Sequence, residues 1–229
     1  TGEGWYRYEG DKKVEAPARL SPTMVKGLRI WIDDDAEQRE QIAQLAKAAG
    51  AEVVINTSSA DLLVIQPWGF DASYFCAEKN LDASLCVALD PLADFARRRT
   101  LMLSVVTNTQ TRDAALALFS SDGVPVTLIS DSPGFVMQRV LATIVNIAAN
   151  IAQRGIASVE DIEDAVKLGL GYPQGPLSWG DKIGGDRVLA ILRNMLTVTG
   201  DPRYRPSPWL MRRVALGVSL LTSETLRGR

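Results

Sequence analysis

The sequence predicts an α/β domain with a parallel sheet, followed by an all-helical domain. Short apolar runs alternate with helical stretches as far as residue 131, which is typical of parallel strands joined by crossover helices. After this point the pattern holds only helices and turns. We therefore expect a tail and linker at 1–22, an α/β domain at 23–131 and a helical domain at 132–229.

The strands and helices of the first domain follow from its apolar periodicity. The predicted strands span 28–32, 52–55, 61–65, 84–89, 101–106 and 124–129. The residues 36–49 repeat apolar side chains with helical period, and 112–119 form a second, short helix. Three aspartates at 33–35 precede the first helix, so we expect them to cap its free amides. Gly50 ends that helix.

The second domain is predicted to centre on one long helix at 135–154. Apolar side chains surround it almost completely, and such a helix requires a central position or a partner. Its remaining polar stripe consists of Arg139, Thr143, Asn146, Asn150 and Gln153. Ser158 and Asp161 predict a capping box that opens the next helix, and the segment 169–173 ends it. Two more helical faces follow at 188–196 and 209–221.

Composition excludes several classes of function. A net charge of −2 gives no global field that favours nucleic acid or an anionic membrane, and no run approaches the ~18 apolar residues of a membrane span. For the cluster Arg97-Arg98-Arg99 we favour a solvated helix face over a phosphate site. Cys76 and Cys86 lie near apolar residues, so we expect buried, reduced thiols and a cytoplasmic protein.

The absence of histidine from the sequence restricts the chemistry further. It excludes Ser–His and Cys–His nucleophiles and every histidine-based metal site. Any general base must therefore be a carboxylate, lysine, tyrosine or cysteine.

The first strand and its turn lack the features that bind a dinucleotide. Such a site needs glycines directly after the strand, which let backbone amides approach the pyrophosphate. Here no glycine lies between Gly27 and Gly50, and the aspartates at 33–35 would repel a pyrophosphate. We predict that this domain binds no NAD. A metal held by these aspartates is the weaker interpretation, because adjacent carboxylates point in different directions, and we predict no metal site.

Two segments carry a resemblance to a known family. Residues 131–140 (DSPGFVMQRV) and 169–176 (GLGYPQGP) resemble the C-terminal helical domain of the 3-hydroxyacyl-CoA dehydrogenases. The α/β half resembles the reduced Rossmann-fold module of long bacterial members, which act on 3-hydroxybutyryl-CoA or 3-hydroxyadipyl-CoA. The first residues, 1–8, resemble the tail that closes a preceding helical domain. The resemblance thus implies the C-terminal part of a longer enzyme, whose N-terminal dehydrogenase half would be its partner.

The resemblance also implies where the catalytic groups should stand. The family oxidises a 3-hydroxyacyl-CoA to the 3-oxoacyl-CoA with NAD, using a histidine of a His-x-x-Asn-Pro pattern, a glutamate partner and an asparagine that holds the substrate carbonyl. Val87 falls at the histidine position and Asp90 at the asparagine of that pattern. No carboxylate stands at 99–102, where the glutamate would lie, and Gln138 replaces the carbonyl-binding asparagine. We therefore expect this chain to be catalytically silent, with no catalytic residue intact.

The resemblance implies three roles for this chain: a scaffold, a dimerisation-type surface and one side of an acyl-CoA groove. The residues expected at that groove or interface are Pro133, Gly134, Phe135, Gln138, Arg139, Tyr172, Pro173, Gly175 and Pro176. With equal weight, the segment 169–177 only turns the chain. A CoA phosphate site is conceivable at Tyr204, Trp209, Arg212 and Arg213. The apolar face of the long helix would allow a homodimer.

Two other classes of function stay open. The chain is alternatively a stand-alone acyl-CoA-binding or assembly module. An active enzyme of another class, built on Asp90, Asp94, Asp131 and Asp181, is the least favoured interpretation, because acidic residues in loops are usually solvated.

Overall fold

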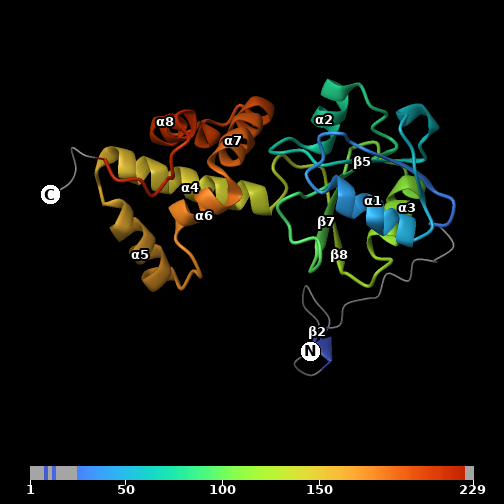
Figure 1. The fold of residues 1–229 in the computed structure, drawn as a ribbon, viewed down its shortest axis with the longest axis horizontal. Coiled ribbons are helices and arrows are strands. Elements are labelled where there is room, and N and C mark those ends of the chain that lie inside the picture. The colour runs from blue at the N-terminus through green and yellow to red at the C-terminus, as the bar shows by residue number, and fades with distance from the viewer. Residues whose placement is uncertain (1–7, 10–11, 14–24, 225–229) are drawn as a thin grey trace.

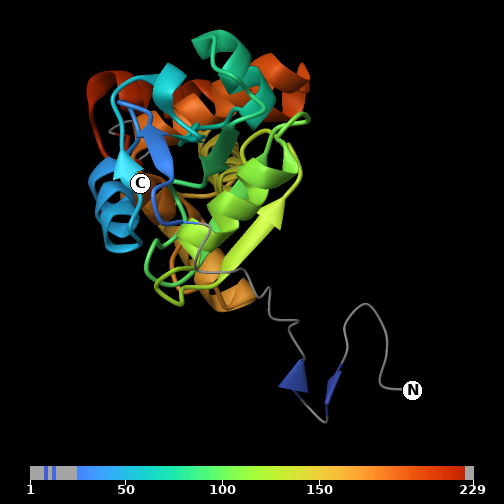
Figure 2. The same cartoon turned by 90° about the vertical axis from the view of Figure 1, so that its right-hand side faces the viewer.

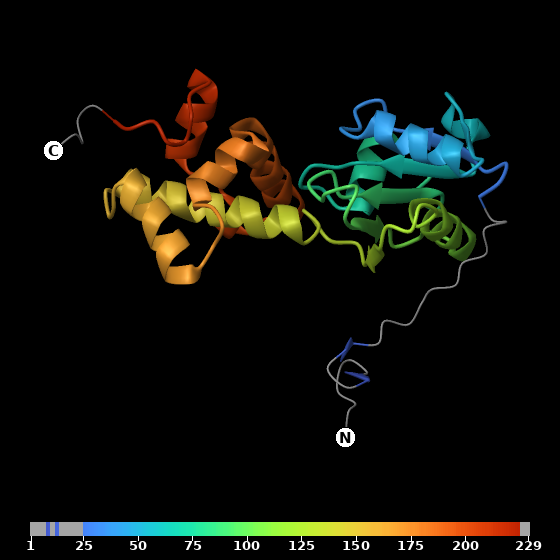
Figure 3. The ribbon, with the colours of Figure 1, turned by 60° about the horizontal axis from the view of Figure 1, so that its bottom comes forward.

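The structure is a computed structural model that describes residues 8–9, 12–13 and 25–224 of the chain. It contains an α/β domain and a helical domain that lie side by side and are joined by the connection between β8 and α4 (Figures 1 and 3). The short strands β1 (Tyr8–Glu9) and β2 (Lys12–Lys13) pair antiparallel. The rest of the predicted tail and linker, 1–22, lies outside the described residues.

Six strands form the sheet of the α/β domain, in the order β4-β3-β5-β6-β7-β8. Their bounds are β3 Arg29–Ile32, β4 Glu52–Val53, β5 Leu62–Ile65, β6 Cys86–Leu89, β7 Arg99–Leu103 and β8 Val126–Ile129. The strands β4, β3, β5 and β6 run parallel, as predicted. The prediction of a parallel sheet is wrong at one step, because β7 runs antiparallel to β6. The connecting residues 90–98 are too few for a crossover helix, so the chain turns back beside β6.

Both faces of the sheet are covered. Successive side chains of a strand point to opposite faces, and in these strands both sets are buried. Ile30 and Ile32 belong to one core cluster, which includes residues of α1 (Arg39–Ala48) and α3 (Thr109–Phe119). Trp31 belongs to the opposite cluster with residues of α2 (Ala72–Lys79), a helix that the sequence analysis did not predict. Figure 2 views the molecule from the end of this domain, with the helical domain behind it.

Two local predictions in this domain are wrong. The aspartates at 33–35 do not cap α1, since its N-cap is Gln38 and makes no side-chain capping bond. The cluster Arg97-Arg98-Arg99 is not a helix face. Arg99 begins β7 and is buried, its guanidinium pairing with Asp122 at 2.7 Å. Cys76 and Cys86 are buried and free, as predicted, and the hydrogen bond between them together with burial raises the pKa of Cys86.

The helical domain is built around α4. Its helices are α4 Met137–Arg154, α5 Val159–Leu170, α6 Pro176–Ile183, α7 Gly185–Thr199 and α8 Pro208–Leu216. The helix α4 contacts the other four, which is the central position that its apolar sequence requires (Figure 1). One stripe remains uncovered, at Val136, Val140 and Ile147. Ser158 caps α5 by accepting from the amide of Asp161, as predicted, and its hydroxyl donates to the Asp161 carboxylate. Among the described residues, no helix combines the length and the apolar character needed to cross a membrane.

Candidate functional site at the domain junction

The carboxyl ends of β5 and β6 meet the helical domain. In open α/β sheets ligands bind outside this edge, so it is where a site is expected. Two glutamines occupy part of it: the Gln38 amide N–H donates to Gln66 Oε1 at 2.7 Å, and Gln66 Nε2 donates to Gln38 Oε1 at 2.9 Å. These two side chains are therefore held by each other and by the backbone at the carboxyl ends of the strands.

Gln138 is the centre of the junction. It lies in the first turn of α4, and none of its surface is exposed. Its Nε2 donates to Asp90 Oδ1 at 2.9 Å and to the Pro67 carbonyl at 3.3 Å, while its Oε1 accepts from the Gly69 amide at 2.8 Å. All these partners belong to the α/β domain, so the side chain joins the two domains.

Asp90 follows β6 and is also buried. Its Oδ1 accepts from Gln138 and from the Leu92 amide, at 2.9 and 3.0 Å. Burial raises the pKa of this carboxyl, and these two hydrogen bonds oppose the effect. A buried carboxylate with raised pKa is a feature of many catalytic acids, but the bonds of this one go to protein groups.

The loop after β5 forms the second contact. Gly69 has φ +79°, and a Cβ there would lie 2.5 Å from the Ile191 carbonyl oxygen of α7. Asn194, also on α7, donates to the Trp68 carbonyl at 2.7 Å. Arg187 pairs with Glu37 at 2.5 Å and its guanidinium lies over the Trp68 ring. The two domains thus meet through close backbone packing as well as through Gln138.

The positions that correspond to the expected proton-transfer residues are apolar or structural. Val87 lies within β6, is fully buried and belongs to the sheet core. The residues 99–102 lie in β7, where the Arg99 guanidinium donates to the Phe119 carbonyl and to the Asp122 carboxylate. Neither segment presents a group that could accept a proton from a substrate.

The elbow between the two domains brings several predicted residues to the junction. Asp131 accepts from the Ala72 and Ser73 amides, so its carboxylate occupies the N-terminus of α2. Gly134 has φ +72°, and a Cβ there would lie 2.6 Å from the Met195 sulfur. Phe135 is fully buried at φ +48°. Arg139 donates to the Ser132 hydroxyl at 2.6 Å and to the Phe135 carbonyl. With Pro133 between them, these residues hold a strained turn.

The second predicted group, Tyr172 to Pro176, lies elsewhere in the helical domain. Tyr172 contacts the Trp179 ring, with centroids 5.2 Å apart, and Pro173 follows it in the turn to α6. Pro176 is the first residue of α6. Glu163 is buried against this turn, and its carboxylate accepts from the Leu177 amide at 2.7 Å. In the described part of the chain, no hydrogen bond or ring contact joins this group to Gln138.

Glu163 also explains the glycine of this turn. A Cβ at Gly175 would lie 2.1 Å from the Glu163 carboxylate oxygen. The motif is therefore a helix start capped by a carboxylate from α5. Four residues of these contacts were not predicted from the sequence: Glu163, Trp68, Gly69 and Asn194. Only Gly69, which follows a strand end and a proline, carried a signal, that of a turn.

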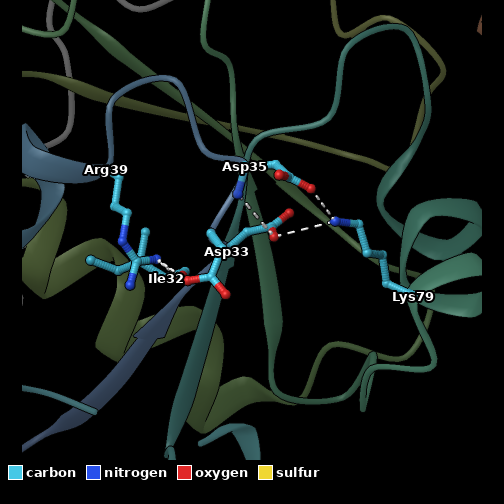
Figure 4. A network of polar contacts seen from close by, with 6 residues as sticks. Ile32, Asp33, Asp35, Arg39 and Lys79 are labelled. Atoms are coloured by element: carbon cyan, nitrogen blue, oxygen red, sulfur yellow. Dashed lines mark hydrogen bonds and ion pairs between the residues drawn. The ribbon is translucent and has the colours of Figure 1, made fainter. Parts of the chain in front are cut away.

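The aspartate turn after β3 holds a lysine (Figure 4). The Lys79 ammonium lies 2.7 Å from Asp35 and 3.4 Å from the buried Asp33. The hydrogen bond to Asp35 raises the pKa of Lys79 and lowers that of Asp35. Arg39 donates to the Ile32 carbonyl. Among the described residues, no group of three or more acidic or cysteine side chains is placed to hold a metal ion.

The conceivable CoA phosphate site at the C-terminal end is wrong. Trp209, Tyr204 and Arg213 are buried, and the Arg213 guanidinium stacks on Trp209 at 3.3 Å from the ring centroid. These three side chains are part of the core, and Arg212 is the one exposed member of the predicted set, so the four do not form an open cluster.

Comparisons with known proteins match this chain to one family. Residues 134–223 match the sequence profile of the family described as 3-hydroxyacyl-CoA dehydrogenase, C-terminal domain. The chain is 33% identical over 160 residues to the 3-hydroxyadipyl-CoA dehydrogenase of Escherichia coli K12, covering 70% of this chain and 33% of that protein. It is 44% identical over 110 residues to the 3-hydroxybutyryl-CoA dehydrogenase of Clostridioides difficile, covering 48% of this chain and 39% of that one.

A solved structure gives the same result. The crystal structure of 3-hydroxybutyryl-CoA dehydrogenase from E. coli K12 superimposes with a TM-score of 0.60 at 33% identity, covering 68% of this chain and 32% of that chain. The chain thus spans 33% and 39% of the length of the two curated relatives.

Proposed function

Because this chain belongs to the 3-hydroxyacyl-CoA dehydrogenase family, we propose that it is the C-terminal portion of an NAD-dependent enzyme that oxidises a 3-hydroxyacyl-CoA to the 3-oxoacyl-CoA. The match covers the described helical domain and extends into the α/β domain. The relatives act on 3-hydroxyadipyl-CoA and 3-hydroxybutyryl-CoA, so a short acyl chain is the substrate class that we propose. The chemistry would take place in an N-terminal dehydrogenase half, in the cytoplasm.

In this proposal the present chain is catalytically silent. The observation that carries it is the bond between Gln138 and Asp90, which stand at the two asparagine positions of the family pattern. Both side chains are buried, and they hold the two domains together. Val87, at the histidine position, is inside the sheet core. The residues that the resemblance associates with catalysis therefore serve as an internal support.

The role that we assign to the chain is that of a scaffold. In this proposal residues 23–131 are a reduced Rossmann-like domain that binds no NAD, 132–229 are the helical domain, and 1–22 are the tail of a preceding helical domain together with a linker. The elbow at 133–135 with Arg139 fixes the start of α4. The turn containing Tyr172, Pro173, Gly175 and Pro176 would lie against acyl-CoA in the complete enzyme.

The uncovered stripe of α4 supports a docking role. Val136, which directly precedes α4, and Val140 and Ile147 within it are exposed along one face. Exposed apolar side chains in a row are typical of an interface. In the complete enzyme we assign this stripe to the preceding helical domain. In its absence, a second copy of this chain would cover it.

Calorimetric titration of this chain with NADH and, separately, with acetoacetyl-CoA tests the proposal. We expect no binding of NADH at the aspartate turn and no turnover with both ligands present. Micromolar binding of NADH that Asp35→Ala changes would place a nucleotide at the turn and refute the silent scaffold. A matched control is Asp113→Ala, which removes a carboxylate of α3 that pairs with Arg112.

A further inference from the structure

A basic groove lies in the helical domain, between the C-terminal half of α4, α7 and the segment 202–208. It has a volume of about 930 Å³, which is within the range of small-molecule sites. Its charged lining residues are Arg154, Arg193, Arg203 and Arg205. Among the described residues, none that lines it is acidic. The groove therefore has a charge opposite to that of the chain as a whole, whose net charge is −2.

The four arginines differ in what already neutralises them. Arg203 pairs with Asp201 at 2.7 Å, an exposed pair of small energetic value. Arg154 ends α4, where a cation favours the helix dipole. Arg193 and Arg205 are exposed, and neither makes a side-chain ion pair within the described ranges. Of the four arginines, these two are therefore the least explained by contacts within the fold.

The rim of the groove is fixed rather than loose. The buried Asn146 donates to the Arg205 carbonyl at 3.0 Å and accepts from the Ser207 amide at 2.8 Å. Gln153 accepts from the Trp209 amide at 2.8 Å. Prolines at 202, 206 and 208 restrict the same segment. The polar stripe of α4 thus holds the backbone that carries Arg203 and Arg205, and little ordering is left for a ligand to induce.

The remaining wall is apolar. Ile156 is exposed there, and Ile151, Leu196 and Met211 complete the surface. A simple inorganic anion would leave this wall in water. A ligand that joins an anionic group to a flat ring system would use both parts, since guanidinium forks match phosphate oxygens and apolar side chains cover a ring.

We propose that this groove binds a phosphorylated nucleoside, its phosphates on Arg193 and Arg205 and its base against the apolar wall. The concave shape and the volume favour this ligand over an acidic peptide, which needs an extended surface. The inference rests on the arginines and the apolar wall of the groove, and none of these residues carries the proposed function.

Calorimetry on the whole chain with ADP, inorganic pyrophosphate, adenosine and a hexaglutamate peptide tests the assignment. We expect ADP to bind at least about tenfold more tightly than pyrophosphate or adenosine, because only ADP uses both parts of the groove. Raising the salt concentration should weaken it. Equal affinity for ADP and pyrophosphate, or tighter binding of the peptide, would overturn the proposal.

The variant Arg193→Glu/Arg205→Glu locates the site. Both side chains are exposed, so the fold should persist, which circular dichroism and urea unfolding can check. We expect it to lower ADP affinity by at least about tenfold. The matched control is Arg97→Glu, which changes an exposed arginine of the α/β domain. ADP binding that survives the double change, or that Arg97→Glu removes equally, would refute the groove. NADH binding lost only in the double variant would place that ligand in the groove and leave the silent scaffold intact.

Discussion

The Gln138 amide nitrogen and the Asp90 carboxylate oxygen lie 2.9 Å apart, and both side chains are buried between the two domains. They are 48 residues apart in the chain. The oxygen of the same amide accepts a hydrogen bond from the Gly69 N–H. One side chain therefore orders the loops that follow β5 and β6. Such a fully satisfied polar cluster specifies how two domains meet.

Removal of the amide should weaken this junction. We expect Gln138→Ala to lower the free energy of unfolding by about 2 kcal/mol, because the buried Asp90 carboxylate and the Gly69 amide lose a partner. Urea unfolding followed by circular dichroism measures it. Gln44→Ala, at an exposed position of α1, is the control and should change stability by less than about 0.5 kcal/mol. Equal effects of the two changes would contradict the junction role.

The buried carboxylate should make stability depend on pH. Burial raises the native pKa of Asp90, so between the unfolded value of about 3.9 and the native value the folded state binds more protons. The free energy of unfolding contributed by this group therefore falls as pH rises through that interval. We expect Asp90→Asn to be about as stable as the original at pH 4 and more stable at pH 7.

The check is urea unfolding at both pH values, with Asp94→Asn as control because Asp94 is exposed. A difference between Asp90→Asn and the original that does not grow with pH would show that the carboxylate is not destabilised by burial.

The close approach of the Gly69 backbone to α7 should be as important for the stability of the domain junction as the hydrogen bonds of Gln138. Gly69→Ala adds a Cβ that would lie 2.5 Å from the Ile191 carbonyl oxygen at φ +79°. Gly123→Ala adds one at φ +83° with nothing within 4 Å. We expect the second change to cost about 1 kcal/mol from backbone strain alone, and the first to cost more by at least about 2 kcal/mol. Thermal unfolding of both variants gives the difference, and similar melting temperatures would count against close packing.

The start of α6 should depend on Glu163. Glu163→Ala leaves the Leu177 amide without its acceptor, and we expect a loss of about 2 kcal/mol in unfolding free energy. Glu160→Ala, exposed on the same helix, should cost much less. Gly175→Ala, whose Cβ would strike this carboxylate, should be as harmful as Glu163→Ala, whereas Gly169→Ala, with open space around it, should be neutral or slightly stabilising. Denaturant midpoints separate these outcomes.

The exposed stripe of α4 should drive self-association of the isolated chain. We expect dimers in size-exclusion chromatography with light scattering at high micromolar concentration, because Val140 and Ile147 are apolar and uncovered. Val140→Glu/Ile147→Glu should give monomers. Leu168→Glu, at an exposed apolar position of α5, is the control and should still dimerise. A strict monomer before any change would contradict this use of the stripe.

Local patterns predicted much of the fold correctly. Apolar runs located the six strands of the sheet, and a helical period located α1, α3 and α4. These features depend on contacts between near neighbours, which the sequence displays directly. The helix α2 escaped because its apolar residues follow no single face, and α6 because a proline motif was taken as a turn alone.

The sequence pattern did not show which groups the polar side chains contact. The aspartates at 33–35 were predicted to cap the following helix, but Asp33 and Asp35 pair with Lys79 of α2 instead. Arg99 looked like part of a solvated cluster and is buried against Phe95 and Asp122. In both cases the partner is remote in the chain, so no local rule could supply it.

The sequence by itself determined the class of fold, the apolar character of α4, the family resemblance and the lack of a histidine base, because each is a property of residue types and short spacings. Only the tertiary structure decided that β7 reverses, that Gln138 binds Asp90, and that four arginines from α4, α7 and 202–208 line one groove. These features require segments far apart in the chain to meet. Their geometry is set by packing of the whole, which periodicity along the chain does not encode.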